Sequence, residues 1–213
     1  MKKTNWDKLG WLVAAGLAGI MLGGGFQGGS VKLGVVDVAK VIEQSDMGKK
    51  NQDDFAAMKS AREGVLQFID NYRVLTIEQA QKIRDLSLKQ APTTAEKAEL
   101  ERVKAEVVAS DKKAKELAQK PNLTPEERTL MEEYAKRSQT MEETAQQWYR
   151  AFTNEMQSWA DKQKQVSLDK ARESVQDIGK RDGYTVVYEA GLAPFGANDI
   201  TDAALKQMNT KKP

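Results

Sequence analysis

The chain of 213 residues contains no cysteine and no histidine. Without cysteine it can form no disulfide, no thiolate metal site and no cysteine nucleophile. Without histidine it lacks the commonest metal ligand and the usual general base. It also has no G-x-x-x-x-G-K-[ST] loop for nucleotide phosphates. We therefore expect a protein that is not an enzyme, with no catalytic residues, no metal and no cofactor.

A strong excess of charge of either sign is also missing. The formal net charge is +2, with 40% hydrophobic and 30% charged residues. The segment 1–29 carries this whole excess, because it holds three lysines and a single aspartate. No uncompensated basic stripe remains in the rest of the chain, so we expect no nucleic-acid partner.

Long hydrophobic runs are absent except near the N-terminus. The segment 1–29 begins with lysines, continues through the apolar run Trp11–Leu22 and ends in a glycine-rich stretch. That order is typical of a secretory signal peptide. The run is shorter than the roughly 20 residues that span a membrane. Extended to Phe26 it would form an N-terminal anchor and give membrane association through residues 11–26. We expect export, with cleavage and anchoring as the two alternatives for the leader.

Sequence typical of β-strands is scarce and lies at the two ends of the chain. Leu33–Asp37 and Tyr184–Glu189 are rich in valine, whereas the residues between them favour helix. We predict an α+β fold, mostly α, with a β body (30–46 and 183–213) and a long antiparallel coiled-coil arm (47–182). Two short strands are too few for a stable sheet, so oligomerisation should complete the body. Its core candidates are Leu33, Val35, Val36, Val186, Val187 and Tyr188.

Apolar spacing and capping signals predict four helices between the strands. The first is short, 38–44, and the second runs from Met47 to Gln90, where Pro92 stops it. Capping boxes at Thr93 and Thr124 begin the third and fourth helices, 94–120 and 125–181. The extra helix 94–120 either extends the arm beyond a kink at Pro92 or folds at its tip, and we favour the extension. A final short helix follows the second strand.

The fourth helix carries a stripe of methionine and aromatic residues at spacings of three and four. Such side chains suit an adaptable apolar binding surface. The alternative is ordinary packing between the helices of the arm. The candidate binding residues are Met131, Met141, Trp148, Phe152, Met156 and Trp159.

Two terminal segments resemble the Skp/OmpH family of periplasmic chaperones. They are KLGVVDVAKVIEQSDMGKK (32–50) and GYTVVYEAGLAPFGANDITDAALKQMN (183–209). The resemblance implies a homotrimer in which strands from three subunits form one body and three arms surround a cavity. Members of this family hold unfolded outer-membrane proteins in that cavity without ATP, and the stripe residues would then be client-binding candidates. The resemblance places the protein in the periplasm.

Two features depart from the family pattern. The chain after the leader is neutral, whereas the archetypal member is strongly basic, and the arm holds extra residues around 94–124. Despite these departures, the resemblance implies an ATP-independent periplasmic holdase for unfolded outer-membrane or envelope proteins. The alternative is a coiled-coil tether of the cell envelope, held in the inner membrane by an uncleaved leader.

Overall fold

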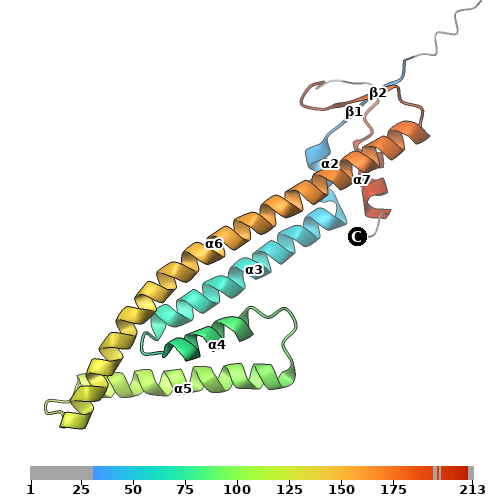
Figure 1. Cartoon of the computed structure of the whole chain (residues 1–213). Helices are drawn as coiled ribbons and strands as arrows, with labels where there is room; N and C mark the ends of the chain where they lie inside the picture. The colour runs from blue at the N-terminus through green and yellow to red at the C-terminus, as the bar shows by residue number, and fades with distance from the viewer. Residues whose placement is uncertain (1–30, 194–195, 197, 211–213) are drawn as a thin grey trace, which may run out of the picture.

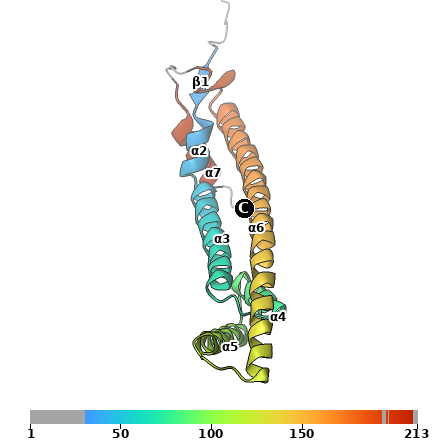
Figure 2. The ribbon, with the colours of Figure 1, turned by 90° about the vertical axis from the view of Figure 1, so that its left-hand side faces the viewer.

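A computed structural model describes residues 31–193, 196 and 198–210, so the predicted leader lies outside the described residues. A small body stands at one end of a long helical arm (Figures 1 and 2). The predicted α+β, mostly helical fold is confirmed. In chain order the elements are β1 (Leu33–Val36), α2 (Val38–Gln44), α3 (Asp46–Asn71), α4 (Ile77–Ser87), α5 (Thr94–Ala118), α6 (Pro125–Arg181), β2 (Val186–Glu189) and α7 (Thr201–Thr210).

The body is built on a parallel pair of strands from the two ends of the chain. β1 pairs with β2 in the register Leu33 to Val186 and Val36 to Glu189. Both strands are shorter than predicted. Asp37 caps α2 instead of continuing β1, because its side chain accepts a hydrogen bond from the Lys40 amide at 2.8 Å. On its other edge β1 forms a bridge from Val35 to Asp199.

One face of this sheet lies on α2, α6 and α7. The core of the body is a cluster of buried apolar side chains from the sheet and from these three helices. A fully buried serine, Ser45, then joins α2 to α3: its hydroxyl donates to the Ile42 carbonyl and accepts from the Gly48 amide. A side chain at Gly48 would lie 1.9 Å from the Ile42 oxygen, so only glycine allows this close turn. The cluster consists of Val36, Val41, Ala171, Ile178, Ile200, Ala204 and Met208.

The arm consists of α3 and the much longer α6, which lie side by side (Figures 1 and 2). α6 has 57 residues, which corresponds to about 85 Å. The expected signals begin it: Thr124 caps the helix, Pro125 occupies the first turn and Glu127 completes the capping box. At the other end Gly183 adopts φ +70° just after the C-cap, a conformation that favours glycine.

The predicted second helix is wrong as a single element. The chain leaves the helix after Asn71, turns, and enters α4 at Ile77. A capping box at Thr76 and Gln79 begins α4, and Leu75 in the turn is fully buried. The sequence signal was present, since Thr-Ile-Glu-Gln at 76–79 has the same S/T-x-x-E/Q pattern that marks the two later helices.

The favoured extension of the arm beyond Pro92 is also wrong. α4 and α5 pack against each other as a side hairpin (residues 77–118) near the outer end of the arm. In Figure 1 this hairpin projects beneath α3, and α5 leads back to the start of α6. The structure therefore agrees with the other alternative, in which the extra helix folds at the tip.

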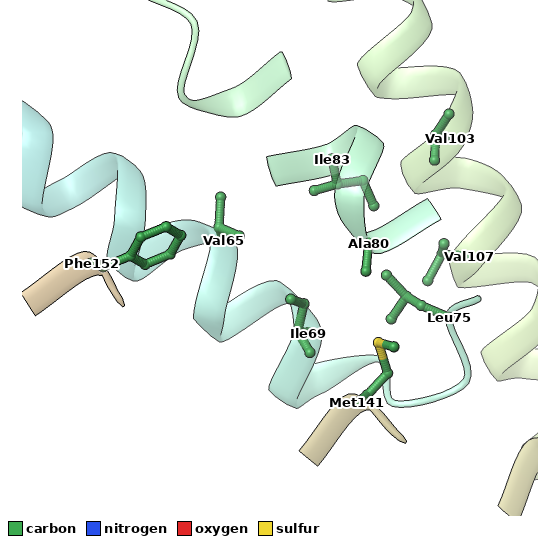
Figure 3. Packing of buried hydrophobic residues seen from close by; sticks show 9 residues of the cluster. All are labelled: Val65, Ile69, Leu75, Ala80, Ile83, Val103, Val107, Met141 and Phe152. Carbon is green, nitrogen blue, oxygen red and sulfur yellow. The ribbon is translucent and has the colours of Figure 1, made fainter. Parts of the chain in front are cut away.

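The side hairpin shares one core with the arm. Nine buried side chains from α3, α4, α5, α6 and the turn before α4 form this outer core (Figure 3). Val74, Leu117 and Tyr134 continue it toward the tip. The hairpin is therefore part of the packed arm and not an attached loop. The outer core consists of Val65, Ile69, Leu75, Ala80, Ile83, Val103, Val107, Met141 and Phe152.

Two adjacent valines of α5 test this shared core. Val107 is fully buried, whereas its neighbour Val108 is 42% exposed. We expect Val107→Ala to lower the free energy of unfolding by about 2 kcal/mol, from lost burial and the cavity left behind. Val108→Ala should change it by less than about 0.5 kcal/mol. Urea unfolding at one fixed protomer concentration measures both, and equal effects would contradict the shared core.

Candidate functional site

Exposed apolar side chains gather on the body. In the described part of the chain seven large hydrophobic side chains are exposed, and five of them belong to the body. Leu33 pairs with Val186, and Tyr188 pairs with Val35, on the sheet face turned away from the helices. β2 is also an edge strand of the two-stranded sheet. We call Leu33, Val186 and Tyr188 the body patch; Val31 and Leu192 are exposed just outside the strands in sequence.

The structure divides the six predicted body residues between two faces. Val36 is buried against the helices, and Val187 is half-buried beside it. Leu33, Val186 and Tyr188 are exposed on the body patch. Val35 is half-buried, because the segment before α7 lies against it. A single chain therefore uses only part of this apolar set for its own core.

A groove of about 1150 Å³ lies where the body meets the arm. Its walls come from α2, α3, α6 and the ends of both strands, while α7 contributes nothing to the lining. The apolar lining includes Val38, Ile42, Phe55, Trp159, Leu168 and Val175. Charged residues of both signs also line it, Glu43 and Glu189 with Lys164 and Arg172. Such a groove can take an apolar segment without selecting for its charge.

The predicted stripe on α6 does not form one surface. Met141 and Phe152 are buried in the outer core. Met131 packs against the cluster of Val74, Leu117 and Tyr134. Trp148 is half-buried under the guanidinium of Arg84, which lies 4.7 Å from its ring centre. These four side chains therefore take part in packing within the arm, and their role in client binding stays a prediction.

Nearer the body neither of the remaining stripe residues is fully buried. Met156 is half-buried, and Trp159 lines the groove with its ring centre 6.1 Å from that of Phe55. Sequence reasoning missed the contributions of α2 and α3 to this site. The signal was weak, because Val38, Ile42 and Phe55 follow helical spacing that packing alone would explain.

Charged side chains on the side hairpin pair with one another. Arg102 donates two hydrogen bonds of 2.7 Å to Glu99, and Lys82 also pairs with Glu99. These partners lower the pKa of the Glu99 carboxyl to about 2. Lys89, followed by the Thr93 amide, lowers the pKa of Glu96 to about 2 in the same way. Exposed pairs of this kind contribute little to stability, but they leave few unpaired charges at this end of the hairpin.

Other classes of site find no support in the described part of the chain. It holds no group of three acidic side chains close enough to bind a metal ion. None of the helices the structure describes is long and apolar enough to cross a membrane. The candidate anchor at residues 11–26 lies outside the described residues.

Comparison with known proteins supplies the family. The family model described as outer membrane protein (OmpH-like) matches residues 32–208, which extends from β1 into α7. The chain belongs to this family. No curated protein and no solved structure matches it. The resemblance seen in the two terminal segments thus holds through the arm, and the OmpH-like family comprises periplasmic chaperones.

The charge pairs of the side hairpin predict a measurable titration. We expect Arg102→Gln to raise the pKa of Glu99 from about 2 toward its ordinary value, because the bidentate partner is lost. Lys104→Gln is the matched control, since Lys104 pairs with Glu101 instead. Side-chain carboxyl NMR between pH 1.5 and pH 6, a range that brackets the ordinary glutamate pKa of about 4.3, follows both. A Glu99 midpoint that stays low in Arg102→Gln would contradict the pairing.

Proposed function

We propose that this OmpH-like chain is an ATP-independent holdase of the periplasm that keeps unfolded outer-membrane proteins from aggregating. The family match over residues 32–208 carries the proposal. The architecture supports it, because a small body with a long arm offers a large exposed surface. The absence of histidine and cysteine from the sequence fits a function that depends on binding alone.

The working form in this proposal is a homotrimer. A two-stranded sheet is marginal by itself, and here one of its faces exposes the body patch. Strands from further copies would cover that patch and pair with the free edge of β2. A closed arrangement would bring several arms to one side of the body, with a cavity between them.

Clients would be held by many weak apolar contacts. The groove at the junction of body and arm supplies one such surface, with Phe55 and Trp159 at one part of its wall. Its mixed charges suit clients of varied composition, and the neutral chain offers no strong electrostatic capture. Met141 and Phe152 are buried in the arm, so this proposal gives them no direct contact with the client.

A membrane-anchored tether is the second candidate function. It is favoured by the run Trp11–Leu22, which follows three lysines and can be extended to Phe26. Cell fractionation distinguishes the two functions. A tether stays with membranes after a salt wash, whereas a soluble holdase is released by osmotic shock.

Aggregation of a β-barrel protein tests the holdase directly. A urea-unfolded outer-membrane protein is diluted into buffer with and without the chain from Ser30 onward, and light scattering is followed. We expect the chain to suppress the light scattering, with saturation near one oligomer per client. Added salt should change this suppression little, because the contacts are apolar. Full scattering in the presence of intact oligomer would refute the holdase.

Two matched valines test the role of the body patch in assembly. Val186 on β2 is 40% exposed and Val108 on α5 is 42% exposed. We expect Val186→Asp to shift the oligomer toward monomer, because a charge would be buried between copies. Val108→Asp should leave the mass unchanged. Sedimentation equilibrium measures both variants, and an unchanged mass for Val186→Asp would contradict assembly through this patch.

A further inference from the structure

One pair of neighbouring residues differs chemically from the rest of the chain. Asp182–Gly183 is the only place in the sequence where an aspartate or an asparagine precedes a glycine. In such a pair the glycine amide nitrogen can attack the side-chain carbonyl carbon of the preceding residue, because glycine has no β-carbon that blocks the approach. Every other aspartate and asparagine is followed by a residue with a side chain.

This pair lies at the junction between α6 and β2, at the body end of the arm (Figure 1). Asp182 is the C-cap of α6, and Gly183 follows it with φ +70°. The Tyr184 amide donates to the Gly179 carbonyl at 2.9 Å, which closes the turn. Gly183 is exposed, and a side chain added to it would meet no atom within 4 Å. The space beside Gly183 is therefore open to water.

Two features of the structure slow an attack on Asp182. The Arg181 guanidinium donates to both carboxylate oxygens of Asp182, at 2.7 and 3.0 Å. This pairing is the main cause that lowers the pKa of the Asp182 carboxyl, and the charge of Lys32 is a weaker one. The turn is the second restraint, because Asp182 has ψ 6° and ring closure requires the following peptide bond to rotate. Helix ends fray, so this rotation is accessible at the end of α6.

We propose that Asp182–Gly183 is a site of spontaneous aspartate isomerisation and that Arg181 restrains the reaction. The Gly183 nitrogen forms a bond to the side-chain carboxyl carbon of Asp182. A carboxyl oxygen leaves as water with its own proton and the amide proton, and a five-membered succinimide remains. Water then adds to either carbonyl and reopens the ring. The products are the original aspartate and isoaspartate, whose backbone runs through the side-chain carbon. One water is lost and one is gained, so no other reactant is needed.

Isoaspartate at this position disturbs the strand pair. The Asp182 carbonyl accepts a hydrogen bond from the Lys32 ammonium at 2.8 Å, and the Thr185 amide donates to the Lys32 carbonyl at 2.8 Å. These contacts fasten the end of α6 to the residue before β1. Isomerisation adds one carbon to the backbone between α6 and β2, and it turns the carbonyl that Lys32 contacts into a free carboxylate. The loosened junction follows from the chain itself and does not depend on the proposed client.

Substitution of Arg181 tests the restraint. The protonated carboxyl is the reactive form, and Arg181 keeps fewer Asp182 side chains protonated at a given pH by lowering their pKa. We therefore expect Arg181→Gln to isomerise several-fold faster than the unchanged chain. Arg181→Lys keeps a cation and should stay close to the unchanged chain. Lys180→Gln is the matched control, because it removes an equal charge from an exposed neighbour, while the ion pair of Asp182 is with Arg181.

Peptide mapping measures the reaction. Folded full-length chain is incubated at about pH 5, just above the ordinary aspartate pKa, and samples are cut with a glutamate-specific protease. The peptide 174–189 then carries the pair. Succinimide appears as the loss of one water, and isoaspartate as a second chromatographic peak of unchanged mass. Isoaspartate no more abundant at Asp182 than at the other aspartates would overturn the proposal. A rate in Arg181→Gln equal to that of the unchanged chain would overturn the role of Arg181.

Unfolding of fresh and aged samples tests the consequence. We expect aged Arg181→Gln, which has accumulated isoaspartate, to unfold at a lower urea concentration than a fresh sample of the same variant. The comparison within one variant removes the direct effect of the substitution. Equal unfolding midpoints, with isoaspartate present in the aged sample, would contradict the loosened junction.

Discussion

The pairing of β1 with β2 is the constraint on which the rest of the structure depends. The strands are parallel and come from the two ends of the chain, so a long crossover must connect them. The whole arm is that crossover. α3 leads away from the body and α6 returns to it, so the strand pair holds the first residues of α3 and the last residues of α6 at the same body. Because the described part of the chain leaves Leu33, Val186 and Tyr188 exposed on one face of the pair, the same constraint that builds the body also gives it an apolar surface.

The unequal lengths of the two arm helices follow from this arrangement. α3 ends at Asn71, whereas α6 continues well beyond it toward the tip. The side hairpin fills the difference by placing α4 and α5 against the unmatched part of α6. Apolar side chains of α6 that α3 does not reach, such as Tyr134, are thereby buried beside Leu117 of α5. The outer core therefore exists because the side hairpin packs where α6 is longer than α3.

Local chemistry predicted much of this fold. Capping boxes placed the starts of α5 and α6, and valine-rich segments placed both strands to within two residues at either end. The sequence did not lead us to the break at Thr76, because apolar residues recur at helical spacing from Phe55 to Leu86. We gave that spacing more weight than the capping box at Thr76, although the same pattern correctly marked the two later helices. Rhythm shows that a helix has an apolar face but not which partner covers it. The direction of the side hairpin depends on the packing of Leu75 and Ile83 in the same core as Val103. Such contacts between distant residues are not visible in the local sequence.

The candidate site was harder to predict for a related physical reason. Met141 and Trp159 look equivalent on α6, since both are large apolar residues at helical spacing. Their roles differ because Met141 is buried in the four-helix outer core, whereas Trp159 is half-buried and lines the groove. The accessible apolar surface of α6 therefore lies outside the outer core, at a position that helical spacing alone does not distinguish from a buried one.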